Sequence, residues 1–85
     1  MFILYRQEMR EYGTDNVVTD VDIIKLCENR EACISKLFSE VSGYKSLEDY
    51  PFDTLEKIEQ ALSERGYVKV HKEYITNYHY KIKEI

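Results

Sequence analysis

Hydrophobic and polar positions alternate in the first part of the chain, with the two-residue period of a β-strand. One alternating stretch covers residues 2–9, and a second, VVTDVDIIKL, begins at residue 17. Both are rich in aromatic or β-branched residues, which favour strands. The segment 11–16 between them contains Gly, Asp and Asn, which tolerate the backbone geometry of a turn. The pattern therefore predicts a β-hairpin.

The second of these stretches has an alternative interpretation. Thr19 could cap one long helix over residues 20–41, because apolar residues recur there at helical spacing. The charged run ENRE at 28–31 interrupts that apolar stripe, however. We therefore favour the strand.

Two segments in the middle of the chain have the period of amphipathic helices. The first is expected to begin after Asn29, whose side chain can cap it, and to end at Gly43. The second is expected to begin at Asp53, which forms a capping-box pattern with Glu56, and to end at Gly66. The predicted buried stripes are Ile34, Leu37, Phe38 and Val41 in the first helix and Leu55, Ile58 and Leu62 in the second.

Two further strands are predicted at the end of the chain, over residues 67–71 and 78–85. The element order is then ββααββ. Hairpins at both ends with helices between them indicate one α+β domain over residues 1–85, in which a small antiparallel sheet carries both helices on one face. The loop residues expected to cover its core are Leu47, Tyr50 and Phe52.

The first hairpin is apolar on both of its faces. Two helices can cover only one face of a sheet, so the other face would expose an apolar patch, which soluble monomers avoid unless it is used. The residues expected on the uncovered face are Ile3, Tyr5, Ile24 and Leu26, and those expected under the helices are Phe2, Leu4, Val21 and Ile23. A bulge near residues 23–24 could instead turn part of the patch inward.

The last predicted strand has two possible uses. Tyr78 and Tyr80 share one face of it, while His79, Lys81 and Lys83 share the other and are expected in water. Tyrosines turned toward the helices would fill the core, whereas tyrosines turned outward could stack on the bases of a single-stranded nucleic acid. We favour the core, because a small sheet has few other large side chains to fill it.

The charge of the chain is uneven. Residues 1–64 hold seven Lys/Arg and fourteen Asp/Glu, a net charge of −7, whereas residues 65–85 hold five Lys/Arg and two Asp/Glu, a net charge of +3. The two values sum to the net −4 of the whole chain. An acidic protein repels nucleic acid in general, so direct binding would have to be local to the C-terminal segment.

No sequence motif for a metal, a cofactor or catalysis is found. The three glycines stand apart, whereas a phosphate-binding loop needs them clustered. Cys27 and Cys33, like His71 and His79, lack the paired short spacings of a zinc site. No nucleophile and base stand in a recognisable pattern. We therefore expect a protein without metal, cofactor or enzymatic activity, with both cysteines half-buried as small apolar side chains.

The segment DIIKLCENREACISKLF, residues 22–38, resembles the strand–turn–helix of many small uncharacterised domains of phages and mobile elements. Such domains begin with a hairpin, enter a helix through a polar turn with an EA step, and finish on an extended strand like NYHYKIKEI here. The resemblance covers about half of the chain and concerns element order. It implies a setting of host–virus conflict, in which such domains bind and modulate a protein, and it carries over no functional residue.

Together these observations favour a small non-enzymatic protein-binding module, such as an anti-CRISPR-like inhibitor of a host protein. Its candidate partner-binding residues are Ile3, Tyr5, Ile24 and Leu26, with Glu56 and Glu59 on the second helix. The two glutamates could occupy the basic site of a partner that binds nucleic acid, although such charges usually form only a solvated face.

Two alternatives remain open at this point. One is a domain that binds single-stranded nucleic acid through Tyr78, Tyr80, Lys81 and Lys83, and the other is a structural homodimer. The N-terminal apolar run ends at Arg6 and no stretch approaches the ~20 apolar residues of a membrane span. We therefore expect a cytoplasmic protein without a membrane partner, in the host cytoplasm if a phage encodes it.

Overall fold

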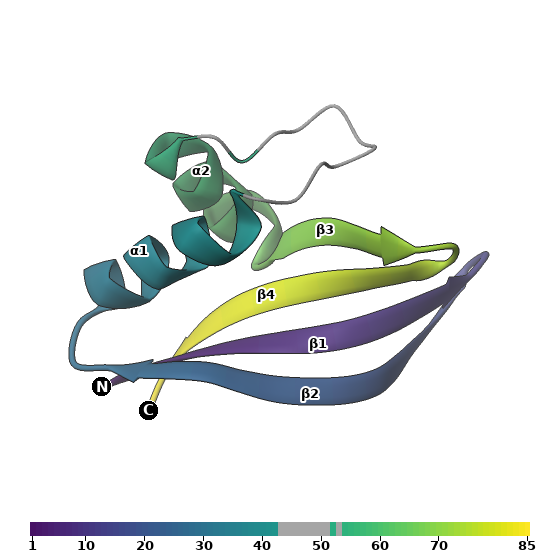
Figure 1. The fold of residues 1–85 in the computed structure, drawn as a ribbon, viewed down its shortest axis with the longest axis horizontal. Helices are drawn as coiled ribbons and strands as arrows, with labels where there is room; N and C mark the ends of the chain where they lie inside the picture. Colours follow the sequence, from purple (N-terminus) through teal and green to yellow (C-terminus); the bar gives the residue numbers. More distant parts are fainter. Residues whose placement is uncertain (43–51, 53) are drawn as a thin grey trace.

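The computed structural model describes residues 1–42, 52 and 54–85 (Figure 1). Its elements are β1 (Phe2–Tyr12), β2 (Asp15–Cys27), α1 (Arg30–Val41), α2 (Leu55–Arg65), β3 (Val68–Glu73) and β4 (Thr76–Glu84). The strands form an open antiparallel sheet of order β2-β1-β4-β3, and the helices pack against it. The predicted α+β fold is confirmed, and the alternative of one helix over 20–41 is wrong.

The first and last strands of the chain pair at the centre of the sheet. In this antiparallel ladder Leu4 lies opposite Ile82, and Arg6 lies opposite Tyr80. At its end the backbone N–H of Ile85 donates to the carbonyl oxygen of Met1, at 2.9 Å. The sheet is therefore complete only when the two ends of the chain have met.

The helices lie over the end of the sheet that holds both termini, and the two hairpin turns lie at the opposite end (Figure 1). Leu4, Val68 and Tyr80 on the sheet are fully buried, as are Leu37 of α1 and Ile58 of α2. These side chains belong to one core cluster. The prediction that Tyr80 fills the core is confirmed.

Helix α1 begins where the sequence predicts. The Oδ1 atom of Asn29 accepts a hydrogen bond from the backbone N–H of Ala32, at 2.9 Å, which satisfies one of the free donors of the first turn. The helix ends at Val41, with Ser42 as its C-cap. Gly43, the predicted end, lies outside the described residues.

The two cysteines meet where β2 leads into α1. Cys27 and Cys33 are both buried and reduced. Burial, with a hydrogen bond to Cys27, raises the pKa of the Cys33 thiol to about 11. The Cys33 thiol is therefore protonated at neutral pH, and both cysteines pack as the small apolar side chains that the sequence predicts.

Helix α2 begins one residue later than predicted. Its N-cap is Thr54, whose Oγ1 atom accepts from the backbone N–H of Lys57 at 3.3 Å, so the prediction of a cap at Asp53 is wrong. Asp53 itself lies outside the described residues. The predicted end is confirmed: Gly66 has φ +82°, a left-handed conformation that favours glycine.

The predicted apolar stripe of α2 is only partly used. Ile58 is fully buried and Leu62 packs against the core, but Leu55 is 47% exposed. Phe52 also packs against the core, as predicted. The corresponding predictions for Leu47 and Tyr50 fall outside the described residues.

A bulge in β2 exchanges the faces of two isoleucines. Leu4 lies opposite Lys25 and Tyr5 opposite Ile23, which leaves Ile24 as an extra residue on β2. Ile24 packs against the core while Ile23 is 67% exposed. The predicted faces of these two residues were therefore wrong, because one extra residue shifts the alternation of every residue beyond it.

The packing of α2 predicts a graded response to truncation. Ile58→Ala should lower the free energy of unfolding by roughly 2–4 kcal/mol, because it leaves a cavity in the core. Thr54→Ala should cost about 1 kcal/mol through the lost cap. Leu55→Ala is the matched control and should change stability by less than about 0.5 kcal/mol. Urea unfolding measures all three, and equal losses for Ile58 and Leu55 would show that the helix is rotated from its place here.

Candidate functional site

The face of the sheet that points away from the helices, called here the open face, has an apolar side built by β1 and β2. Ile3 lies opposite Leu26, and Tyr5 lies opposite Ile23. Residues opposite each other in a ladder share a face of the sheet. Farther along the same ladder, Val21 lies opposite Gln7 and Val18 lies opposite Met9.

The outer row of this apolar side lies on β2, the edge strand of the sheet. It consists of Val18, Val21, Ile23 and Leu26, which are 46–67% exposed, and we call it the apolar strip. The neighbouring row on β1 (Ile3, Tyr5 and Met9) is half-buried. A continuous row of exposed apolar side chains on an edge strand is what soluble proteins avoid unless it is used. The apolar strip is therefore the candidate site.

Sequence reasoning located this site in part. Ile3, Tyr5 and Leu26 lie together on the open face, as predicted. Ile24 does not, because the bulge turns it toward the core. The prediction placed Val21 and Ile23 under the helices, so it missed the most exposed part of the strip. Asp20 and Asp22, which alternate with Val21 and Ile23, were the available signal that the apolar residues here do not face a core.

The two predicted acidic partner residues lie on α2, on the other side of the sheet. Glu59 is engaged within the chain, since its carboxylate accepts hydrogen bonds of 3.1 and 2.9 Å from Nη1 of Arg30. This pair joins the start of α1 to α2. Glu56 is exposed in the first turn of α2, where a negative charge complements the helix dipole. The structure therefore does not bring these glutamates together with the apolar strip.

The other half of the open face is polar and is organised around Glu11, near the end of β1. Its carboxylate lies 3.1 Å from Nζ of Lys69, accepts from Nδ2 of Asn77 at 2.7 Å, and lies 3.9 Å from Nε2 of His79. Oδ1 of Asn77 lies 3.1 Å from Nδ1 of His71. The cluster ties the far end of β1 to the β3–β4 hairpin.

His79 is buried within this polar half, so the expectation that it lies in water is wrong. Its ring stacks on Tyr67, with ring centroids 4.3 Å apart and planes at 7°. Burial lowers the pKa of His79, and the positive charges of Lys69 and Lys81 act in the same direction, whereas Glu11 opposes them. The imidazole is therefore neutral at pH 7.

The C-terminal strand separates its tyrosines from its lysines. Lys81 and Lys83 lie on the open face, opposite Tyr5 and Ile3. Tyr80 is fully buried on the helix side of the sheet. A surface on which bases stack between aromatic rings and lysines needs both kinds of side chain on one face. The predicted nucleic-acid residues are therefore not assembled into one site.

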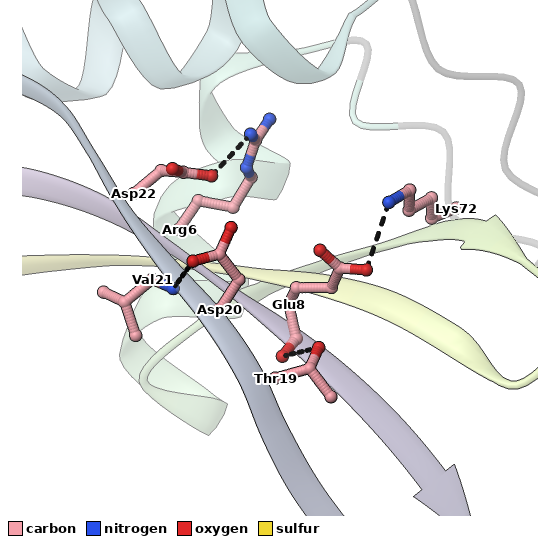
Figure 2. Close-up of polar contacts among 7 residues, drawn as sticks. All are labelled: Arg6, Glu8, Thr19, Asp20, Val21, Asp22 and Lys72. Carbon is pink, nitrogen blue, oxygen red and sulfur yellow. Dashed lines mark hydrogen bonds and ion pairs between the residues drawn. The ribbon is translucent and has the colours of Figure 1, made fainter.

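Beyond the helices, the helix side of the sheet carries charged side chains that contact one another (Figure 2). The guanidinium of Arg6 donates to Asp22 at 2.9 Å and lies 4.3 Å from the centre of the Tyr78 ring. Burial disfavours its charge, but the nearby Tyr80 hydroxyl and the hydrogen bond to Asp22 outweigh that effect and raise the pKa of Arg6.

Two further contacts on this surface involve Glu8 and Asp20. The carboxylate of Glu8 accepts from Nζ of Lys72 at 3.1 Å. The carboxylate of Asp20 accepts from the backbone N–H of Val21 at 2.9 Å, on its own strand (Figure 2). Arg6, Glu8 and Asp20 on this side of the sheet thus have partners within the chain, in contrast to the apolar strip.

Within residues 1–42, 52 and 54–85, no three or more His, Cys, Asp or Glu side chains are grouped so that they could hold a metal ion. Neither described helix is both long and apolar enough to cross a membrane. No protein-family model, curated protein or solved structure matches the chain. The resemblance to phage and mobile-element domains stays a prediction.

The burial of His79 predicts a pH-dependent stability. Its pKa is lower in the folded chain than in the unfolded chain, where it is near 6.5. As the pH falls below about 6.5, the unfolded chain takes up the proton first, so the fold loses at most about 1.4 kcal/mol per pH unit from this group. His79→Phe keeps a ring against Tyr67 and should lose less stability between pH 7 and pH 5.5 in urea unfolding. An equal loss in both proteins would contradict the assignment.

Proposed function

We propose that this chain is a non-enzymatic protein-binding module whose contact surface is the apolar strip, with Ile3 and Tyr5 beside it. The observation that supports the proposal most directly is the exposure of four large apolar side chains in one row. These side chains stay exposed although the other face of the same sheet is packed against two helices. A contact that covered them would remove apolar surface from water, which is the main driving force of protein association.

The size of this effect is sufficient for a specific contact. Each side chain of the strip would bury roughly 100 Å², or about 2.5 kcal/mol before the costs of association. Ile23 has the largest exposed fraction of the four, 67%, and lies between Val21 and Leu26 in the row. We therefore expect Ile23 to be the anchor of the interface.

A protein partner suits this surface better than nucleic acid does. The strip carries no charge, whereas affinity for nucleic acid comes mainly from cations that neutralise phosphates. The lysines of the open face, Lys69, Lys81 and Lys83, lie on β3 and β4, with the whole of β1 between them and the strip. The setting we propose is the one that the sequence resemblance implies: the assembly formed through the strip modulates a host protein in the cytoplasm, without a cofactor.

Charge placed at the centre of the strip tests the proposal. Ile23→Lys should leave the fold intact, because this side chain faces solvent in the free chain. Leu55→Lys is the matched control, since it introduces the same charge at an exposed leucine of α2. Circular dichroism and urea unfolding establish that both variants are folded.

Binding is measured by incubating the immobilised wild type and the two variants with a cytosolic extract of the cell in which the chain acts, which is the host cell if a phage encodes it. The proteins that each of the three retains are then quantified. A protein held by the wild type and by Leu55→Lys should be retained at least about tenfold less by Ile23→Lys, since a desolvated charge costs a few kcal/mol. Equal retention by a folded Ile23→Lys protein would show that the strip is not the contact surface.

A further inference from the structure

We propose that the partner at the apolar strip is a second copy of this chain, and that the two copies pair through antiparallel β2 strands related by a twofold axis at Ile23. This inference rests on the proposed function, because it names the occupant of the same surface. It is carried by three features of β2: an outer backbone edge that pairs with no other described strand, a self-complementary charge pattern and the apolar strip.

The free edge follows from the sheet order. β2 is an outermost strand with 13 residues, and the outer edge of such a strand carries N–H and C=O groups that can pair with another chain. The backbone N–H of Val21 donates to the carboxylate of Asp20 rather than to β1, so this amide points outward. Ile23, two residues farther on, presents its backbone in the same direction. Ile23 and Val21 are therefore placed to exchange backbone hydrogen bonds with a second β2 strand.

A twofold axis at Ile23 fixes the pairing of its neighbours. Ile23 lies opposite its own copy. Because Ile24 is the extra residue of the bulge, Asp22 comes opposite Lys25 of the second copy, and Val21 comes opposite Leu26. Val21 and Leu26 both belong to the open face, so the two apolar strips join across the axis.

The charges meet on the other face of the same ladder. Asp22 and Lys25 lie opposite Arg6 and Leu4 of β1, which places both on the helix side. The carboxylate of Asp22 is 47% exposed despite its contact with Arg6. Lys25 is exposed and has no ion-pair partner among the described residues. The twofold axis creates this Asp–Lys pair twice.

Neighbouring registers place like charges together, which destabilises a strand pair. An axis at Val21 brings Asp20 opposite Asp22 of the second copy, twice. An axis at Asp22 or at Lys25 brings that residue opposite itself. The charge pattern of β2 therefore selects the register centred on Ile23 over these three alternatives.

The buried area limits the strength of the dimer. Four side chains from each copy at roughly 100 Å² each give on the order of 800 Å², whereas stable interfaces bury about 1,200–2,000 Å². The Val21 amide must also exchange the Asp20 carboxylate for a backbone carbonyl. We therefore expect a dimer that forms with rising protein concentration rather than a permanent one.

Substitutions that exchange the charges of Asp22 and Lys25 test the proposed pairing of the two β2 strands. Dimerisation is measured by sedimentation velocity over a range of protein concentrations. Lys25→Asp and Asp22→Lys should each weaken dimerisation about tenfold or more, because each turns both Asp–Lys pairs into like-charge pairs. An equimolar mixture of the two variants should associate about as well as the wild type, since each like-charge pair is then replaced by an opposite-charge pair. Lys57→Asp makes the same charge change on α2 and should have no effect on dimerisation.

Asp22→Lys also removes the contact to Arg6, so its fold is checked by circular dichroism. If it does not fold, Lys25→Asp and the double exchange Asp22→Lys/Lys25→Asp carry the test: the first weakens the dimer and the second restores it. The inference is overturned if the wild type stays monomeric up to about 1 mM. It is also overturned if the wild type dimerises but Lys25→Asp does not weaken the dimer. In the first case the proposed function stands if Ile23→Lys still abolishes capture of another protein. If the wild type dimerises and Ile23→Lys does not weaken the dimer, both the inference and the proposed function are overturned.

Discussion

The arrangement of the whole molecule depends on one constraint: two short helices cover only one face, and only one end, of a four-stranded sheet. The core forms where they lie, between Leu37 and Ile58 on the helices and Leu4, Val68 and Tyr80 on the sheet. The rest of the sheet must meet water or another molecule. Every feature outside the core is a way of dealing with that uncovered surface.

Much of the uncovered surface carries polar side chains that have hydrogen-bond or ion-pair partners within the chain. On the open face Glu11 gathers Lys69 and Asn77, and beyond the helices Arg6 is held by Asp22 over the Tyr78 ring. The apolar strip on β2 is the exception. The chain gives Arg6, Glu8 and Glu11 partners of their own but leaves a row of aliphatic side chains on β2 in water without a packing reason. This is why we assign the strip to binding.

The features of the fold that depend on local sequence patterns could be predicted from the sequence. The element order, the cap at Asn29 and the left-handed Gly66 follow from periodicity and from residues that suit helix ends. What it did not predict depends on pairing between distant strands. The bulge at Ile24 arises only in the ladder with β1. The burial of His79 on β4 requires the ring of Tyr67, which directly precedes β3. The sequence therefore predicted the right region for the strip but only one of its four residues, Leu26, among the candidate contact residues.

Hydrogen exchange of the β2 amides at low and high protein concentration tests the central claim, that the β2 edge and its strip form the contact with a second copy. The account predicts that Val21 and Ile23, whose amides face outward, exchange rapidly when dilute and slow markedly when concentrated. The amide of Arg6 on the central strand β1 should be protected at both concentrations. Rates for Val21 and Ile23 that do not change with concentration would contradict the account.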